Sequence, residues 1–175
     1  MIVIVMGVSG SGKSTLGELL AKKLGIPFLD ADEYHPPENV AKMAAGTPLT
    51  DADRGPWLAR LNGELRKKGK AVLACSALRE AYRRVLSQGL ADCRFVHLRG
   101  SIELIRARLQ ERRHRYMPAS LLESQFATLE PPADAIDVDI GASTADCLAT
   151  IVARLAPAPA PAPSGARPAG GRTPD

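Results

Sequence analysis

Cysteines, aromatic residues and long apolar runs are all scarce in this chain of 175 residues. The three cysteines, Cys75, Cys93 and Cys147, are far apart and form no C-x-x-C pair, which argues against a zinc site or a disulfide framework. We expect free thiols in a reducing compartment, the cytoplasm. No stretch approaches the ~18 consecutive apolar residues of a membrane span, so no membrane contact is expected. The apolar run at residues 2–6 has no basic leader, and we interpret it as a strand.

Charge of one sign is also in small excess, since the formal net charge is +4. This excess requires no nucleic acid partner, because an enzyme that binds anionic substrates explains it equally well. Bulky apolar residues are nearly absent from residues 156–175, which hold six of the fourteen prolines. Such a segment cannot bury enough apolar surface to offset its ordering entropy. We therefore expect one domain over residues 1–155 and a disordered tail over residues 156–175.

Short apolar stretches alternate with helical patterns along the expected domain. Strands are expected at residues 2–6, 26–30, 71–75, 93–98 and 136–140. Helices are expected at residues 13–24, 38–45, 57–68, 79–86, 102–113, 120–129 and 144–155. Continuous apolar strands are typical of a parallel sheet covered on both faces, so we predict a doubly wound α/β domain with five parallel strands. Ligands of such domains bind at the carboxyl ends of the strands.

The strongest motif lies between the first expected strand and the first expected helix. Residues 7–14 read Gly-Val-Ser-Gly-Ser-Gly-Lys-Ser and match the phosphate-loop pattern G-x-x-x-x-G-K-[ST]. Glycines let backbone N–H groups approach a phosphate chain, and the N-terminus of the helix adds partial positive charge. Lys13 is expected to reach the β- and γ-phosphates, and Ser14 to bind Mg²⁺. The pattern therefore predicts a nucleoside triphosphate site. Its expected contacts are Gly7, Val8, Ser9, Gly10, Ser11, Gly12, Lys13, Ser14 and Thr15.

Two acidic residues lie at the end of the second expected strand. Asp30 is the best candidate for the Mg²⁺ shell, directly or through a water, and Asp32 is placed to accept a hydrogen bond from an attacking hydroxyl. Both could instead cap the following turn. His35 is a further candidate for substrate binding, with packing in a turn as its alternative.

Basic residues follow the second and third expected strands. Arg54 lies three residues before the only tryptophan, Trp57, and arginine at the mouth of a site usually holds a carboxylate. Trp57 itself is consistent with core packing. Arg79 and Arg83 are four apart, so they share one helix face and could hold one anion together, or form a solvated basic face. We take all three arginines as candidates for substrate binding, and Asp51 and Asp53 as N-cap acids.

Arginine becomes dense at the end of the helix expected at residues 102–113. The pattern is typical of a lid that closes over transferring phosphates, where arginine would stabilise the developing charge. We take Arg112 as the catalytic arginine of this lid. A basic helix end that complements its own dipole is the alternative. The cluster consists of Arg106, Arg108, Arg112, Arg113, His114 and Arg115.

Together these motifs resemble the gluconate kinase family of bacteria, over essentially residues 3–155. The most specific segments are His35-Pro36, Asp-Ala-Asp-Arg-Gly-Pro-Trp-Leu at 51–58, Cys-Ser-Ala-Leu at 75–78 and Ser-Gln-Phe-Ala-Thr-Leu-Glu at 124–130. The resemblance implies a small P-loop kinase, related in fold to shikimate and adenylate kinases and usually dimeric. It implies transfer of the ATP γ-phosphate to the 6-hydroxyl of D-gluconate with Mg²⁺. The family commonly has lysine where Arg79 stands.

Two other functions are compatible with a phosphate loop. A kinase of another small hydroxy acid, such as shikimate, usually has a glycine-rich turn after the third strand, and residues 75–78 do not form one. A catalytically silent nucleotide-binding module is the second alternative. The presence of Lys13, Ser14 and both aspartates argues against it.

Overall fold

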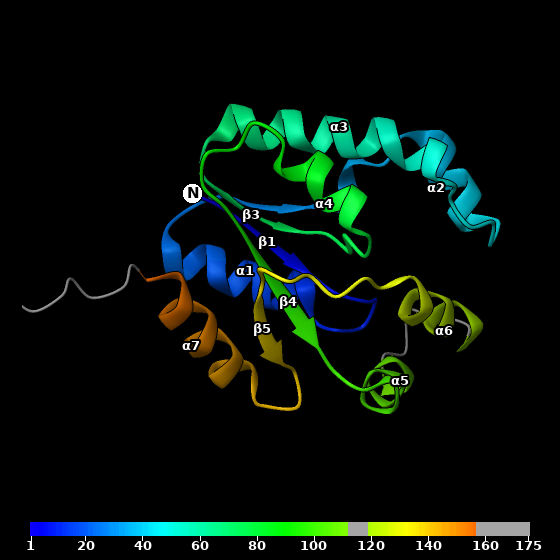
Figure 1. The fold of residues 1–175 in the computed structure, drawn as a ribbon. Coiled ribbons are helices and arrows are strands. Elements are labelled where there is room, and N and C mark those ends of the chain that lie inside the picture. The colour runs from blue at the N-terminus through cyan, green and yellow to red at the C-terminus, as the bar shows by residue number, and fades with distance from the viewer. Residues whose placement is uncertain (112–118, 157–175) are drawn as a thin grey trace, which may run out of the picture.

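The sheet of this protein is parallel and doubly wound, as Figure 1 shows. The structure is a computed structural model that describes residues 1–111 and 119–156. Within these residues the sheet has five strands in the order β2-β3-β1-β4-β5, and every neighbouring pair is parallel. The strands are β1 (Ile2–Met6), β2 (Phe28–Asp30), β3 (Ala71–Ala74), β4 (Cys93–Arg99) and β5 (Ile136–Asp139). The predicted fold class is confirmed.

Helices cover both faces of the sheet. Those of the described residues are α1 (Lys13–Leu24), α2 (Pro37–Ala44), α3 (Asp51–Lys68), α4 (Glu80–Ser87), α5 (Ile102–Glu111), α6 (Ala119–Thr128) and α7 (Thr144–Leu155). A short 3₁₀ helix, η1 (Ala31–Tyr34), follows β2. In Figure 1, α1 and α7 lie on one side of the sheet, α3 and α4 on the other, and α5 and α6 beyond the carboxyl ends of the strands.

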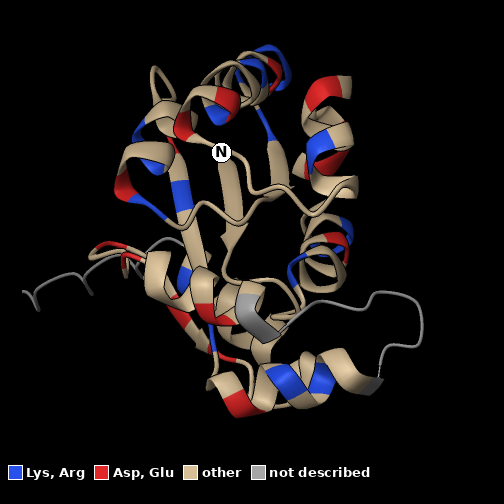
Figure 2. Cartoon of the chain, turned by 90° about the vertical axis from the view of Figure 1, so that its right-hand side faces the viewer, with Lys and Arg blue, Asp and Glu red and all other residues tan. Residues whose placement is uncertain are grey.

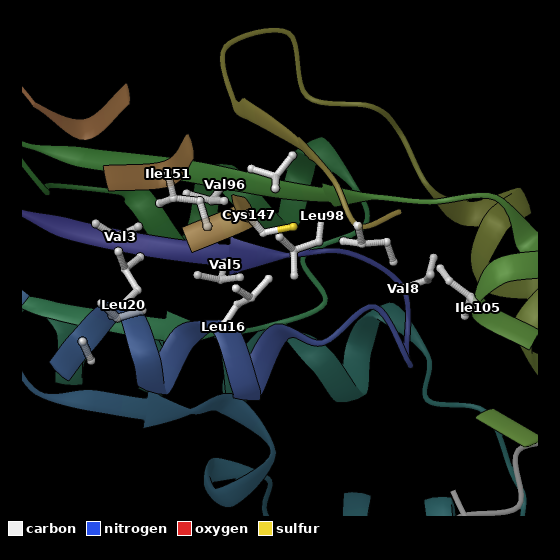
Figure 3. Close-up of a cluster of buried hydrophobic side chains, with 14 of the residues drawn as sticks. Val3, Val5, Val8, Leu16, Leu20, Val96, Leu98, Ile105, Cys147 and Ile151 are labelled. Atoms are coloured by element: carbon white, nitrogen blue, oxygen red, sulfur yellow. The ribbon is translucent and has the colours of Figure 1, made fainter. Parts of the chain in front are cut away.

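The core consists of two apolar clusters, one on each face of the sheet. Successive side chains of a strand point to opposite faces, so β1 contributes to both clusters. Val3 and Val5 pack toward α1 and α7, where Leu20 and Ile151 join them (Figure 3). Ile4 belongs to the cluster under α3. The apolar run that predicted β1 is therefore buried along its whole length.

Two predicted boundaries are wrong. The second strand begins at Phe28 and not at residue 26, because the Ile26 N–H donates to the Ala21 carbonyl (3.1 Å), and Pro27 has no N–H for a sheet ladder. The third helix begins at Asp51, six residues before Trp57.

A capping box explains the early start of α3. The Thr50 hydroxyl accepts from the Asp53 N–H (3.2 Å), and the Asp53 carboxylate accepts from the Thr50 N–H (2.8 Å). Thr50 is therefore the N-cap, which corrects the expectation that Asp51 and Asp53 cap this helix. Asp53 also accepts from Lys42 Nζ at 2.6 Å, and chiefly through this ammonium and the Thr50 groups its pKa is lowered to about 2.

Some sequence-based expectations lie outside the described residues. They concern Arg112, Arg113, His114 and Arg115 of the expected lid, and the expected tail apart from Ala156. In the parts of the chain that are described, no helix combines the length and apolar character needed to cross a membrane.

The Asp53 interaction predicts a pH-dependent contribution to stability. Its folded pKa of about 2 lies below its ordinary value of 3.8, so the ionised carboxylate stabilises the fold above that value. This stabilisation is lost as the pH falls through about 2. Asp53→Asn should therefore lower the melting temperature at neutral pH, and the difference from wild type should shrink below about pH 4.

Thermal melts across this pH range check the prediction, with Asp134→Asn as a control at an exposed position. The control should melt like the wild type. A deficit of Asp53→Asn that is as large near pH 3 as at neutral pH would contradict the assignment.

Candidate active site

The loop between β1 and α1 forms a cradle for an anion. Gly12 is the N-cap of α1 with a φ of 93°, and Gly10 has a φ of 83°. A Cβ at Gly10 would lie 2.9 Å from the Leu109 side chain, so only glycine fits there. Among the described residues, no side chain caps α1, and its first turn has no acidic residue. The first N–H groups of the helix are therefore available to a phosphate.

Lys13, the first residue of α1, lies against this loop. Its ammonium donates a hydrogen bond to the Val8 carbonyl at 3.0 Å. A cation in this position adds to the partial positive charge of the helix N-terminus. The predicted phosphate loop thus combines three sources of positive potential at one place: glycine-rich backbone, helix end and lysine.

Ser14 and Asp30 meet at the edge of the cradle, as the sequence predicted. The Ser14 hydroxyl donates to Asp30 Oδ2 at 2.7 Å, and Asp30 Oδ1 accepts from the Asp32 N–H at 3.1 Å. Asp30 therefore caps η1 and faces the phosphate loop at the same time. A hydroxyl and a carboxylate are hard oxygen donors of the kind Mg²⁺ binds together with phosphate oxygens and water. In the described ranges, no group of three or more His, Cys, Asp or Glu residues could hold a metal.

Trp57 of α3 holds the turn that carries Asp32. Its indole N–H donates to the Ala31 carbonyl at 3.0 Å, and its ring is buried. The His35 imidazole stacks on the indole with 4.1 Å between ring centroids. Trp57 therefore packs in the core and at the same time supports the turn that carries Asp32. Asp32 itself is exposed at the carboxyl end of the sheet.

The charges of Asp32 and Arg54 both reach His35. Burial is the main cause that lowers the pKa of His35, while Asp32 raises it and Arg54 lowers it. Burial favours the neutral imidazole, and the His35 Nδ1 atom is buried without a hydrogen-bond partner among the described residues. The charges of an acidic residue, Asp32, and a basic residue, Arg54, therefore both act on the His35 imidazole.

The end of β3 lies between the phosphate loop and the aspartates. Burial raises the pKa of the Cys75 thiol to about 12, and the charges of Lys13, Asp32 and Asp30 all act on it. The three groups that sequence assigned to donor, metal and acceptor thus surround one strand end. Figure 2 views the molecule from this side and shows basic and acidic residues on the helices around it.

Four residues from α3, α4 and the N-cap position of α4 form what we call the arginine–tyrosine cluster: Asp51, Arg54, Arg79 and Tyr82. The Arg79 guanidinium donates to Asp51 Oδ2 at 2.9 Å, and Arg54 Nη1 lies 3.5 Å from Asp51 Oδ1. The Tyr82 hydroxyl donates to the same carboxylate. Both guanidinium groups lie over the Tyr82 ring, 5.6 and 5.9 Å from its centroid. The hydrogen bond from Tyr82 and then the two arginines lower the pKa of Asp51, which keeps it ionised.

Arg83 does not join this cluster. It is buried, and its guanidinium donates to the Ala77 carbonyl (3.1 Å) and the Leu78 carbonyl (3.2 Å). Ala77 has a φ of 45°, the left-handed region that side chains rarely adopt, so Arg83 holds a strained turn after β3. This corrects the expectation that Arg79 and Arg83 hold one anion together.

A cavity that the sequence did not predict lies beside the phosphate loop. Its volume is about 420 Å³, and it opens between α1, α5 and the turn after β5. Arg108 crosses to the Ile140 carbonyl with a hydrogen bond of 2.5 Å. Arg108 carried a sequence signal as part of the arginine-dense helix, and Ser11, Gly12 and Thr15 did so as part of the predicted phosphate loop. The lining residues are Ser11, Gly12, Thr15, Leu16, Arg108, Ile140, Ala142, Thr144 and Cys147.

Comparisons with known proteins agree with this geometry. The sequence model of the shikimate kinase family matches residues 9–129. The gluconokinase of Gluconobacter oxydans is 51% identical over 136 residues, which cover 75% of this chain and 76% of the relative. A probable gluconokinase of Xenopus tropicalis is 50% identical over 164 residues, 79% of this chain and 86% of the relative. The crystal structure of a gluconokinase from Sinorhizobium meliloti superposes with a TM-score of 0.81 at 42% identity, covering 86% of this chain and 89% of that one.

A phosphate loop on the central strand of this sheet, with a carboxylate beside its serine, defines a small P-loop kinase. Enzymes of this class transfer a phosphoryl group from ATP to a hydroxyl. The sequence identity over most of both chains is more specific than the shared fold. The chain belongs to the gluconokinase family of these kinases.

The inward position of Arg83 predicts that it stabilises the fold, in contrast to its neighbour Arg84. Arg83→Met should lower the free energy of unfolding by about 1–3 kcal/mol, because buried carbonyls lose their charged donor. Arg84→Met, on the exposed side of α4, should change it by less than about 0.5 kcal/mol. Urea denaturation of both variants checks this, and equal stabilities would contradict the structural role of Arg83.

Proposed function

We propose that this protein is a gluconokinase that transfers the γ-phosphate of ATP to the 6-hydroxyl of D-gluconate. The products are 6-phospho-D-gluconate and ADP, in the catabolism of sugar acids. Membership of the gluconokinase family supports this substrate, and so does a site with a phosphate cradle at one end and paired arginines at the other. Gluconate needs a site with both features, because its reacting hydroxyl and its carboxylate lie at opposite ends of one carbon chain.

The observation that carries the substrate assignment is that the arginine–tyrosine cluster already holds a carboxylate. The side chain of Asp51 is 62% exposed, and exposed ion pairs contribute little to stability because solvent screens them. A substrate carboxylate can therefore replace Asp51, or bind beside it, at small cost. Arg54, Arg79 and the Tyr82 hydroxyl supply the donors for it.

The acceptor hydroxyl then lies toward Asp32. His35 stacks on Trp57, which holds the turn that carries Asp32, and this position supports a substrate that passes the imidazole between the aspartate and the arginine. Asp32 accepts a hydrogen bond from the 6-hydroxyl and orients its oxygen toward the γ-phosphate. A loose phosphoryl-transfer transition state asks for positioning more than for a strong base.

The donor side uses the phosphate loop. Backbone N–H groups and Lys13 bind the β- and γ-phosphates, and the cavity beside Arg108 is large enough to take the base of ATP. Ser14 and Asp30 are the side chains that would hold Mg²⁺, and the bound ion would screen the charge of these phosphates. Arg112, outside the described residues, keeps its expected role as the lid arginine.

Other parts of the proposal rest on the sequence. We propose residues 1–155 as the catalytic domain, a disordered tail after them, and action in the cytoplasm, where the free thiols of Cys75, Cys93 and Cys147 stay reduced. The family resemblance supports a homodimer. The net charge of +4 requires no nucleic acid partner, and we propose none.

An acceptor panel tests the proposed reaction against its alternatives. ADP release with MgATP should be fastest with D-gluconate, slower with other aldonic acids, and close to background with shikimate, nucleosides or no acceptor. Phosphorus NMR of the product should show one phosphomonoester on a primary carbon. A preference for shikimate would indicate another hydroxy-acid kinase, and no stimulation by any acceptor would indicate a silent nucleotide-binding protein.

The arginine–tyrosine cluster predicts which arginines bind the substrate acid. Arg79→Ala and Arg54→Ala should each raise the gluconate KM by roughly ten- to a few hundredfold, since a charged hydrogen bond to a carboxylate is lost. The KM for ATP should stay nearly unchanged, because the phosphate loop binds the nucleotide. Discrimination against glucose, which lacks the carboxylate, should shrink in the same variants.

Arg84→Ala is the matched control, because Arg84 lies on α4 but pairs with Glu80 at the exposed surface. Its gluconate KM should equal that of the wild type. If both cluster variants stay within about twofold of wild type, the acid end of the substrate is bound elsewhere.

A further inference from the structure

The motif Ser-Gln-Phe-Ala-Thr-Leu-Glu at residues 124–130 has no role in the reaction as described so far. It covers the end of α6 and the turn that follows, and from there the chain runs back toward β5 (Figure 1). Gln125 of this motif contacts the phosphate loop, 116 positions earlier in the chain. Its Oε1 atom accepts from the Ser9 N–H at 2.7 Å, and its Nε2 atom donates to Ser9 Oγ at 3.1 Å.

The contact fixes the orientation of one peptide unit of the phosphate loop. The Ser9 N–H and the Val8 carbonyl belong to the same planar peptide, and in a trans peptide they point in opposite directions. Gln125 binds the N–H, while the Val8 carbonyl accepts from Lys13 Nζ at 3.0 Å and from the Ser11 N–H at 3.3 Å. Rotation of this peptide would therefore move the acceptor of the lysine.

Gln125 is itself held in place. Phe126 and Leu129 pack against the apolar core on the α1 side. The Glu130 N–H donates to the Leu78 carbonyl at 2.9 Å, and the Glu130 carboxylate accepts from the Glu80 N–H at 2.6 Å. This carboxylate caps α4, whose N-cap residue makes no side-chain cap bond of its own. The segment is thus anchored at the N-terminus of α4, beside Arg79 of the arginine–tyrosine cluster.

We propose that Gln125 is a positioning residue for phosphoryl transfer, which acts through the Val8–Ser9 peptide to hold Lys13 in place for the β- and γ-phosphates. This proposal rests on the proposed function in one respect only, namely that D-gluconate is the acceptor. An amide is the side-chain group that fits this task, because it accepts from an N–H and donates to a hydroxyl at once. A carboxylate would bring negative charge next to the phosphates.

Gln125→Leu removes both hydrogen bonds with little change in volume. We expect kcat to fall roughly tenfold to a hundredfold, because Lys13 is no longer held in place to stabilise the charge of the transition state. The dissociation constant of a fluorescent ATP analogue should rise severalfold. The gluconate KM should change by less than about threefold, because the arginine–tyrosine cluster is untouched. Gln88→Leu, at an exposed position after α4, is the matched control and should behave as wild type.

A double-mutant cycle with Lys13→Ala separates positioning from a loss of fold. If Gln125 acts through Lys13, Gln125→Leu should cost almost nothing further in kcat or nucleotide affinity when Lys13 is already alanine. If Gln125→Leu lowers kcat and nucleotide affinity by the same factor with Lys13 present and with Lys13 replaced by alanine, the proposal is overturned. If Gln125→Leu does not fold, Gln125→Met takes its place in the same cycle. The affinity arm needs no acceptor, so it stays decisive even if D-gluconate proves not to be the substrate.

Discussion

The hydrogen bond between Ser14 and Asp30 sets the geometry on which the rest of the site depends. It joins the first turn of α1 to the end of β2, although β3 lies between β1 and β2 in the sheet. The two elements can meet because all strands are parallel, so their carboxyl ends lie at one edge. Asp30 pairs with Ala74 and Ala74 with Val5, which brings the ends of the three strands to one level. This register brings the phosphate loop, Asp30 and Asp32 to one edge of the sheet.

Two arginines of the site share one carboxylate, because Asp51 pairs with both Arg54 and Arg79. The shared carboxylate reduces the repulsion between the two guanidinium groups and leaves one positive charge in excess. Because the Asp51 ion pairs are exposed, the cluster stays accessible to another carboxylate. The buried Arg83 instead donates hydrogen bonds to backbone carbonyls. Burial thus separates the structural Arg83 from the exposed Arg79, which we propose binds the substrate, although the two are only four residues apart.

Local signals predicted much of this arrangement. The apolar run before G-x-x-x-x-G-K-S predicted β1, the phosphate loop and α1, and a carboxylate at the end of a strand predicted the partner of Ser14. The start of α3 was placed too late, at residue 57, although the helix begins at Asp51 and continues through Pro56. A proline so near the N-terminus of a helix frees only a carbonyl of its first turn.

Features that depend on several distant segments could not be predicted. Helical spacing places Arg79 and Arg83 on one face, but only tertiary packing decides that one points inward and the other toward Asp51. The cavity at Arg108 combines α1, α5 and the turn after β5, and small residues such as Ala142 carry no signal of their own. The Gln125 contact joins residues that are 116 positions apart in the chain.

The central claim is that one substrate spans from Asp32 to the arginine–tyrosine cluster beside the phosphate loop. A crystal structure with D-gluconate, Mg²⁺ and a non-hydrolysable ATP analogue tests it most directly. The account predicts the gluconate carboxylate within hydrogen-bond distance of Arg54 or Arg79, and the 6-hydroxyl between Asp32 and the γ-phosphate. A gluconate bound in the reverse direction, or at another face of the sheet, would contradict it.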